Sequence, residues 1–188
     1  MSSCAARALA VLALALAACV STPPSGPVTP ETFDAERAGL VVPVPDGWKT
    51  RVQETALVYE GKMRVPSFVF YTTKYATLEE GVAALEAEVG AALEEVKVSE
   101  AAAETTLAGY RAFVAEGTGK AEGYTMRWRA TLVDADELTM MLALVPSFLW
   151  GFNKGRVHEF EASVRRAGEP APGDPAGGPA DEQAGEEG

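Results

Sequence analysis

Apolar runs and alternations in the first half of the chain predict several short strands. Residues 40–44 form a β-branched apolar run, and Pro43 cannot donate to a strand ladder, so this strand should lie at an edge or end there. Phe68 and Phe70 alternate with other residues, which places both rings on one face of a strand. The strands expected in this half cover 40–44, 50–52, 56–59 and 65–72.

A helical period replaces the strand pattern after residue 76. Thr77 and Glu80 have the spacing of a capping box, in which the threonine caps the helix and the glutamate reaches back. Apolar residues then recur at helical spacing, at Leu78, Val82, Leu85, Val89 and Leu93. The pattern predicts a helix over 78–95 with a largely acidic outer surface.

The second half predicts a hairpin of longer strands. Residues 110–118 and 124–133 are the two strands, and the glycine-rich segment 117–123 is the expected hairpin loop. Within the second strand, alternation places Trp128 on one face and Arg129 on the other.

Two further segments complete the predicted fold. Residues 138–145 are almost entirely apolar, which is typical of a strand covered on both faces. Residues 155–166 predict a last helix, whose apolar face holds Val157, Phe160 and Val164. The order of strands, helix, strands and helix, joined by hairpin-length turns, predicts an α+β fold. It is a mainly antiparallel sheet flanked by helices on both faces.

The first 18 residues have the pattern of an export signal rather than of a folded element. Arg7 is the only charged residue before Glu31, and an uninterrupted apolar stretch covers residues 8–18. These 11 residues are too few to span a bilayer, since a spanning helix needs about 20 residues. They fit the apolar region of a secretory signal.

The four residues Leu16 to Cys19 resemble the lipobox of bacterial lipoproteins. The resemblance implies cleavage before Cys19, a diacylglycerol on its sulfur and an acyl group on the new N-terminus, which together would hold the chain on a membrane. Val20 stands where an aspartate commonly retains such proteins at the inner membrane, which favours the outer membrane. The alternative is an ordinary signal cleaved at a small-residue site, with Cys19 incidental.

Composition divides the rest of the chain into three parts. Residues 19–31 carry the lipidated cysteine and a Pro- and Ser-rich tether. Residues 32–166 form the folded domain. Residues 167–188 combine glycine, proline and acidic residues without an aromatic side chain, which predicts a disordered acidic tail.

Charge and residue counts exclude several kinds of site. The chain has 16 Lys and Arg against 27 Asp and Glu, a net charge of −11, which argues against nucleic-acid binding. One histidine and two cysteines are too few for most zinc sites. Cys4 leaves with the signal and Cys19 becomes a thioether, so we expect no cysteine nucleophile, disulfide, metal or cofactor.

The remaining polar motifs favour ordinary roles. His158 lies between acidic residues on the last predicted helix, and no serine-hydrolase motif accompanies it, so we interpret it as a surface histidine. Asp134, Asp136 and Glu137 lack the spacing of a calcium loop and are interpreted as turn residues. Residues 117–120 lack the spacing of a phosphate loop.

Three alternating aromatic residues leave two interpretations open. Phe148, Trp150 and Phe152 either close the core beneath the last helix, which we favour, or form an exposed patch for a protein partner or a membrane. Arg127 and Arg129 either add a basic spot to this surface or pair with nearby carboxylates, and we favour pairing.

The order of elements and its landmarks over residues 38–166 resemble the PsbP/DcrB-like domains. The landmarks are an early strand leading to Pro45, Gly47 and Trp48, the mid-chain amphipathic helix, Leu107 to Gly109 before a hairpin of long strands, and a terminal helix reaching Ser163. The resemblance implies an α/β/α sandwich and a non-catalytic module that docks on larger assemblies. It supplies no catalytic or metal-binding residues that can be matched here.

The sequence favours a non-enzymatic, lipid-anchored envelope protein that binds an unidentified protein partner or supports an envelope assembly, in contact with the periplasm. The alternative is a periplasmic carrier whose apolar pocket is lined by Trp128, Met126 and Phe70. An enzyme that uses only Asp, Glu, Ser or Tyr side chains is a third possibility.

Overall fold

A computed structural model describes residues 35, 37–53 and 56–169. Its centre is a seven-stranded, fully antiparallel sheet in the order β2-β3-β4-β8-β7-β6-β5. The strands of this sheet are β2 (Lys49–Gln53), β3 (Ala56–Glu60), β4 (Ser67–Thr72), β5 (Glu94–Leu107), β6 (Tyr110–Ala121), β7 (Tyr124–Asp134) and β8 (Leu138–Pro146). The helices are α2 (Leu78–Ala92) and α3 (Trp150–Ser163), with single 3-10 turns η3 (Lys62–Arg64) and η4 (Ser147–Leu149).

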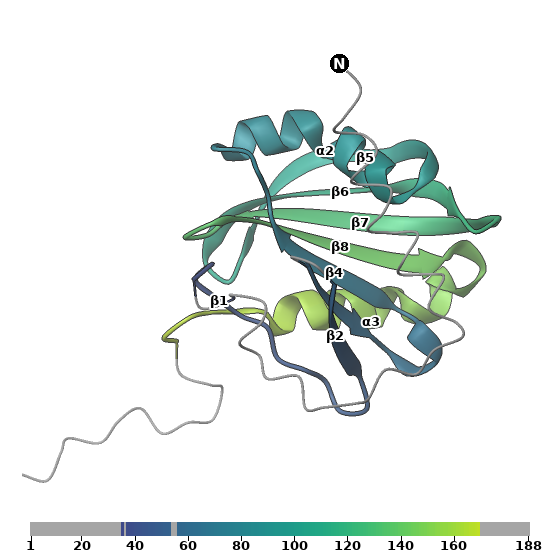
Figure 1. Cartoon of the computed structure of the whole chain (residues 1–188), viewed down its shortest axis with the longest axis horizontal. Coiled ribbons are helices and arrows are strands. Elements are labelled where there is room, and N and C mark those ends of the chain that lie inside the picture. Colours follow the sequence, from purple (N-terminus) through teal and green to yellow (C-terminus); the bar gives the residue numbers. More distant parts are fainter. Residues whose placement is uncertain (1–34, 36, 54–55, 170–188) are drawn as a thin grey trace, which may run out of the picture.

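The two helices lie on opposite faces of the sheet, with α2 above it and α3 below it in Figure 1. Strand β8 is the middle strand of the seven, and all its residues except the last are buried. This confirms the expected strand covered on both faces. It also confirms the α+β fold, a mainly antiparallel sheet flanked by helices on each side.

Each helix closes its own core against the sheet. On the α3 side, the ring of Phe160 stacks on Phe68 at 4.1 Å between centroids and on Trp48 at 5.2 Å. On the α2 side, Trp128 is fully buried beneath the apolar stripe of the helix, which consists of Leu78, Leu85 and Val89. The alternation predicted for β7 is therefore correct, because Trp128 faces one helix and its neighbour faces the other.

The start of α2 confirms the expected cap, and its end corrects the expected length. The hydroxyl of Thr77 accepts a hydrogen bond from the backbone of Glu80 at 3.2 Å, while the carboxylate of Glu80 accepts one from the backbone of Ala76 at 3.1 Å. The helix ends at Ala92 rather than at residue 95, because Leu93 is already extended and leads directly into β5.

Strand β5 has 14 residues, and the sequence pattern did not predict a strand of this length. It is an edge strand whose side chains are mostly exposed, so most of its positions need not be apolar. Its register against β6 also shifts at three places, which interrupts the alternation that identifies a strand.

The prediction of a hairpin loop at residues 117–123 is wrong. Strand β6 continues through Gly117 to Ala121, and the turn is only Glu122 and Gly123, both with positive φ. Gly117 serves packing rather than turning, since a Cβ there would lie 2.3 Å from the ring of Trp128. A side chain at that position could not fit over the buried indole.

The last helix begins earlier than the sequence predicted. Helix α3 spans Trp150–Ser163 rather than residues 155–166, and the amide of Asn153 donates to the carbonyl oxygen of Leu149 at 3.0 Å in its first turn. Beyond it, β9 (Arg165–Arg166) pairs with β1 (Leu40–Val41) in a separate two-stranded sheet. The strand expected at 40–44 is therefore short and ends before the proline.

The signal peptide, the lipobox, the tether and residues 170–188 of the predicted tail lie outside the described residues. The first residue after β9 is hydrogen-bonded, with the backbone N–H of Ala167 donating to Gly39 at 2.9 Å. Within the described part of the chain, neither helix is long and apolar enough to cross a membrane.

Candidate functional site

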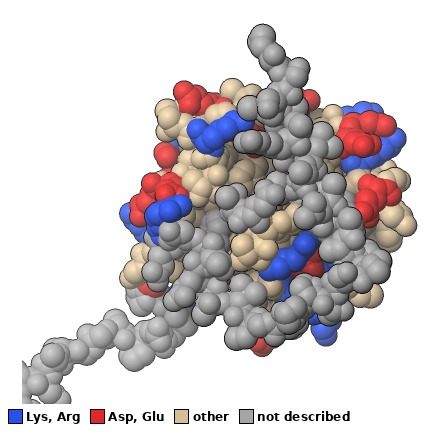
Figure 2. All heavy atoms as spheres, in the orientation of Figure 1, with Lys and Arg blue, Asp and Glu red and all other residues tan. Residues whose placement is uncertain are grey.

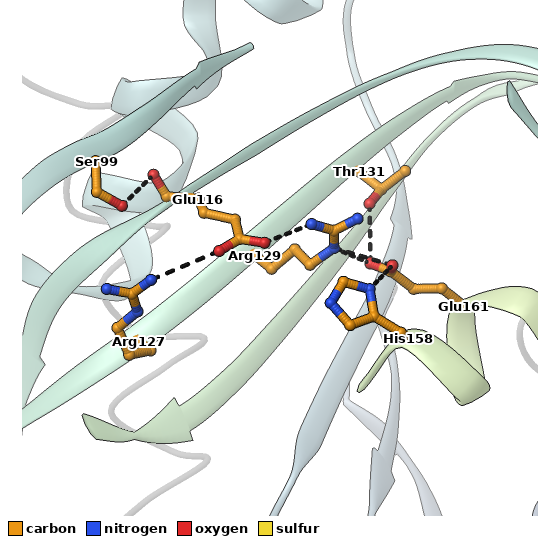
Figure 3. A network of polar contacts seen from close by, with 7 residues as sticks. All are labelled: Ser99, Glu116, Arg127, Arg129, Thr131, His158 and Glu161. Atoms are coloured by element: carbon orange, nitrogen blue, oxygen red, sulfur yellow. Dashed lines mark hydrogen bonds and ion pairs between the residues drawn. The ribbon is translucent and has the colours of Figure 1, made fainter. Parts of the chain in front are cut away.

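Arg129 is held in a cluster of charges between the sheet and α3 (Figure 3). Its Nε lies 2.8 Å from a carboxylate oxygen of Glu161 on α3, and its Nη1 donates to Glu116 on β6. Both carboxylates are buried. The prediction that Arg129 pairs with carboxylates is confirmed, and its guanidinium is not part of an open basic surface.

Burial disfavours the charge on Arg129, but its hydrogen bonds and its attraction to Glu161 and Glu116 outweigh that effect and raise its pKa. The hydroxyl of Thr131 donates to Glu161 at 3.3 Å, and the Nδ1 of His158 lies 3.7 Å from the same carboxylate. The cluster is thus built around two carboxylates bonded by one arginine. This arrangement fixes α3 on the sheet.

Arg127 connects this cluster to the aromatic residues at the start of α3. Its guanidinium lies 3.6 Å from Glu116 on one side and 5.4 Å from the ring centroid of Trp150 on the other. Its Nε is buried without a hydrogen-bond partner among the described residues. Arg127 is therefore less completely paired than Arg129, and its charge lies against an aromatic face.

Phe148, Trp150 and Phe152, which we call the aromatic patch, do not close the core together. Phe148 is 70% exposed and Phe152 is 84% exposed, whereas Trp150 is half-buried against the α3-side core. The favoured expectation of a core-closing role is wrong for the two phenylalanines. The structure exposes both rings, which lie two residues before and two residues after Trp150 in the chain.

A groove that the sequence did not predict lies on the α2 face of the sheet, where α2 does not reach. It has a volume of about 230 Å³, and its surface is mainly apolar. Its floor is formed by apolar side chains of four adjacent strands: Val58, Val69, Leu144 and Met126. Met63 and Tyr124 stand at its rim, 92% and 62% exposed.

The backbone at the Met63 side of this groove is strained. Met63 and Arg64 follow each other in the left-handed region, with φ of 56° and 63°. Non-glycine residues rarely adopt this conformation, and strain of this kind concentrates at binding and switching sites. The fold tolerates it at the position that holds Met63 out toward solvent.

The sequence predicted the wrong residues for the lining of an apolar pocket. Trp128 packs on the α2 side of the sheet and Phe70 on the α3 side, both buried, so they cannot line one cavity. Only Met126 lines the groove. The groove is also open and somewhat smaller than the cavities of about 300–1,000 Å³ that enclose small ligands.

The groove and the aromatic patch occupy the same end of the molecule. Met126 on the groove floor pairs with Pro146, and the chain continues directly into η4 and the first turn of α3, which carry the patch. In Figure 1 this end, at the right, also holds the turn between β6 and β7. We refer to it as the open end.

The other residues considered from the sequence lie elsewhere. Asp136 and Glu137 form the expected turn after β7, where Glu137 lies 2.6 Å from Arg37 and Asp136 accepts a hydrogen bond from Tyr110. His158 is partly exposed beside Glu161, as interpreted from the sequence. Among the described residues, no group of three or more His, Cys, Asp or Glu side chains is placed to hold a metal ion.

Surface charges are compensated locally. Figure 2 shows Lys and Arg beside Asp and Glu in small mixed groups over one face of the molecule. Arg111 bonds to Glu79 and Glu104, each at 2.7 Å, and Lys120 bonds to Glu95 at the same distance. These bonds lower the pKa of Glu79 and of Glu95. These described basic side chains are therefore paired with carboxylates rather than gathered into a basic patch.

Comparison with known proteins identifies the fold. No family model matches the chain, and no curated protein matches it. Among solved structures, LpqN of Mycobacterium tuberculosis, which is involved in cell envelope biogenesis, has a TM-score of 0.45 and 13% identity over 67% of this chain and 82% of that chain. A Pseudomonas aeruginosa protein of unknown function has a TM-score of 0.46 and 11% identity over 62% of this chain and 94% of that chain.

The cyanobacterial PsbP protein of Synechocystis has a TM-score of 0.52 and 12% identity, covering 77% of this chain and 98% of that chain. At this level of identity the likeness concerns the fold alone. The expected PsbP-like α+β sandwich is confirmed.

Proposed function

We propose that the mature chain is a lipid-anchored envelope protein whose domain binds a protein partner at its open end without catalysing a reaction. The observation that carries the proposal is the exposure of two rings, Phe148 and Phe152, on either side of Trp150 in the chain at the start of α3. The lipobox-like residues Leu16 to Cys19 supply the anchor in this proposal, and Val20 favours the outer membrane.

The aromatic patch has the composition of a binding hot spot. Burial of a phenylalanine side chain contributes roughly 1.5–3 kcal/mol. Phe148 and Phe152 are mostly exposed in the free domain, so most of this stabilisation would be gained only when a partner buries them. Trp and Arg are the residues most enriched at the centres of protein interfaces, and here Arg127 lies over Trp150. A partner that covers the start of α3 would bury the two exposed rings.

The compensated charges favour binding over catalysis. Arg129, Glu116 and Glu161 are engaged with one another in holding α3 to the sheet. A binding module requires only that this cluster keep the first turn of α3, and with it the patch, in place.

Photo-crosslinking tests the proposed partner. The full chain, expressed in a bacterial host, would carry benzophenone-alanine in place of Phe152 and be irradiated in intact cells. We expect a discrete adduct whose second component is one protein, identified by its peptides. The matched control carries the same group at Val98, an exposed residue on edge strand β5. Identical adducts from both positions, or none from Phe152, would contradict the proposal.

The anchor requires a separate test. Cys19→Ala removes the only residue that the lipobox resemblance can modify. We expect the variant to lose labelling by a radioactive fatty acid and to leave the membrane fraction. Retention of label and of membrane association by the variant would show that the chain is held by another means.

A further inference from the structure

We infer that the acidic segment 181–188 of this chain binds the exposed face of α3 and competes there with the protein partner. Only the competition rests on the proposed function, since the contact itself lies within one chain. The segment follows the described residues and contains no basic residue. It holds four carboxylates, at Asp181, Glu182, Glu186 and Glu187.

Two cations on α3 are available to these carboxylates. Lys154 and Arg156 are both exposed, and neither forms an ion pair with a described residue. In contrast, Arg111, Lys120 and Arg129 each bond to a glutamate. On a chain with a net charge of −11, two neighbouring unpaired cations are a local exception that attracts negative charge.

The helix places these cations on the two sides of one exposed row. Residues four apart are neighbours on a helix surface, so Arg156 lies one turn after the exposed ring of Phe152. Gly151 and Gly155 form the next row, and a Cβ at either position would meet nothing within 4 Å. Lys154 lies beyond that row. The two positive charges therefore flank a row without side chains, over which a second stretch of chain can pass.

The first half of α3 also lacks carboxylates of its own. Its first turn contains no acidic residue, and no side chain caps it. The partial positive charge at the start of a helix is normally compensated by such groups. Glu161 is buried and bonded to Arg129, and the exposed Glu159 lies in the second half of the helix. The acidic segment would supply the negative charge that is missing here.

The chain is long enough to bring the segment to this face. It leaves the domain after β9, at the opposite end of α3 from Phe152 (Figure 1). From Phe152 to Ser163 the helix rises by about 17 Å, whereas the chain from Glu169 to Asp181 can extend to about 40 Å. A group tethered within reach of its site has an effective concentration on the order of 1 mM, so weak ionic contacts suffice.

The bound segment would guard the exposed rings without burying them. It would lie beside Phe152, so a partner that covers this ring must displace it. Alanine is the only apolar residue of the segment apart from glycine, so the segment cannot replace the apolar contacts of a partner. A partner gains the burial of the rings and displaces the segment, whereas a protein that offers charge alone does not.

A carbodiimide, which joins a lysine amine to a carboxylate in contact with it, tests the contact. In the purified full chain in mild detergent, we expect an intramolecular amide between Lys154 and the segment, identified by peptide mass spectrometry. Salt at about 0.5 M should reduce it at least fivefold, because it screens exposed charges. The control is Lys97 on β5, which is also exposed and unpaired among the described residues. Equal adducts at both lysines, adducts only between two chains, or none would overturn the inference.

Neutralising the segment tests the competition. A variant with Asp181→Asn, Glu182→Gln, Glu186→Gln and Glu187→Gln keeps the chain length. With benzophenone-alanine at Phe152, we expect this variant to give about three times more partner adduct, because a larger fraction of its sites is open. The matched control makes the same change of charge at four exposed glutamates of the domain, Glu86, Glu94, Glu100 and Glu122, and should leave the yield unchanged.

The two experiments separate this inference from the proposed function. An equal yield of partner adduct from the wild type and the neutral segment would overturn the competition. A protein captured at Phe152 without any adduct of Lys154 would support the proposed function and overturn the contact. An adduct of Lys154 without any protein captured at Phe152 would support the contact and contradict the proposed function.

Discussion

At the scale of single residues, Arg129 carries the most consequential polar contacts in the domain. It bonds to two buried carboxylates, Glu116 from the sheet and Glu161 from α3, and Arg127 lies 3.6 Å from the first of them. Removing one member of a buried ion cluster is costly, because the remaining charges stay buried without compensation. The cluster therefore acts as a specific link between the sheet and the helix that carries part of the aromatic patch.

This reasoning predicts the effect of Arg129→Met, which keeps the apolar stem and removes the guanidinium. We expect the free energy of unfolding to fall by about 3 kcal/mol, measured by urea denaturation at neutral pH. The matched control is Arg111→Met, because Arg111 also bonds to two glutamates, but at the surface. Solvent screens that group, so its loss should be much smaller. Equal losses in the two variants would show that burial of the cluster is unimportant.

Tyr59 provides a test of burial on the α3 side. Burial raises its pKa to about 12, and its hydroxyl donates to the carbonyl oxygen of Val42 at 3.2 Å. An unfolded tyrosine has a pKa of about 10, so the stability that comes from burying the neutral hydroxyl is complete below that pH and is lost as the pH rises through the folded pKa. The difference in tyrosinate absorbance between the wild type and Tyr59→Phe should show one ionisation near the folded value. An ionisation near the unfolded value would mean that the ring is accessible.

At the scale of elements, strong periodicity made α2, β7 and β8 predictable. Thr77 and the apolar stripe fixed the start of α2, and the unbroken apolar run of β8 identified the central strand. Strand β5 was not predictable in the same way, because its side chains are mostly exposed and its register shifts against β6. Its position depends on pairing with β6, which local sequence does not encode.

Glycine was the second source of error. Gly117 and Gly119 predicted a loop, yet both lie in β6, where they make room for Trp128 and Leu93. Their role arises from residues distant in the sequence. A local pattern cannot distinguish a glycine that turns the chain from one that admits a large neighbour.

Two glycine substitutions test this distinction. Gly117→Ala would place a Cβ 2.2 Å from the carbonyl oxygen of Lys97, so the sheet must shift and we expect severe destabilisation or failure to fold. Gly90→Ala in α2 meets nothing within 4 Å. It should stabilise the domain by about 0.5–1 kcal/mol, because alanine favours the helix. Thermal unfolding of both variants measures this, and a harmless Gly117→Ala would refute the packing role.

At the scale of the whole molecule, the layers could be predicted but the open end could not. The groove is assembled from side chains of separate strands together with η3, and no short segment carries its signal. Trp128 and Phe70 were assigned to one pocket because both are large and apolar, whereas the sheet separates them. The patch was found from its alternating aromatics, and only the structure showed which of them are exposed.

The open end places two apolar surfaces around one corner of the sheet. Pro146 lines the groove, and two residues later Phe148 begins the aromatic patch. A partner that covers the corner would bury both surfaces at once. Under the proposed function this corner is covered by the protein partner, and loss of the patch should weaken the complex without unfolding the domain.

The most direct measurement is the size of the complex extracted from membranes in mild detergent. The full chain should migrate on a native gel in one reproducible assembly larger than the chain itself. Phe148→Ser combined with Phe152→Ser should release it to the size of the free chain, while Val98→Ser should leave the assembly intact. Each variant should keep the thermal stability of the wild type. An assembly that survives loss of both phenylalanines, or a wild-type chain that migrates alone, would contradict a partner-binding role for the open end.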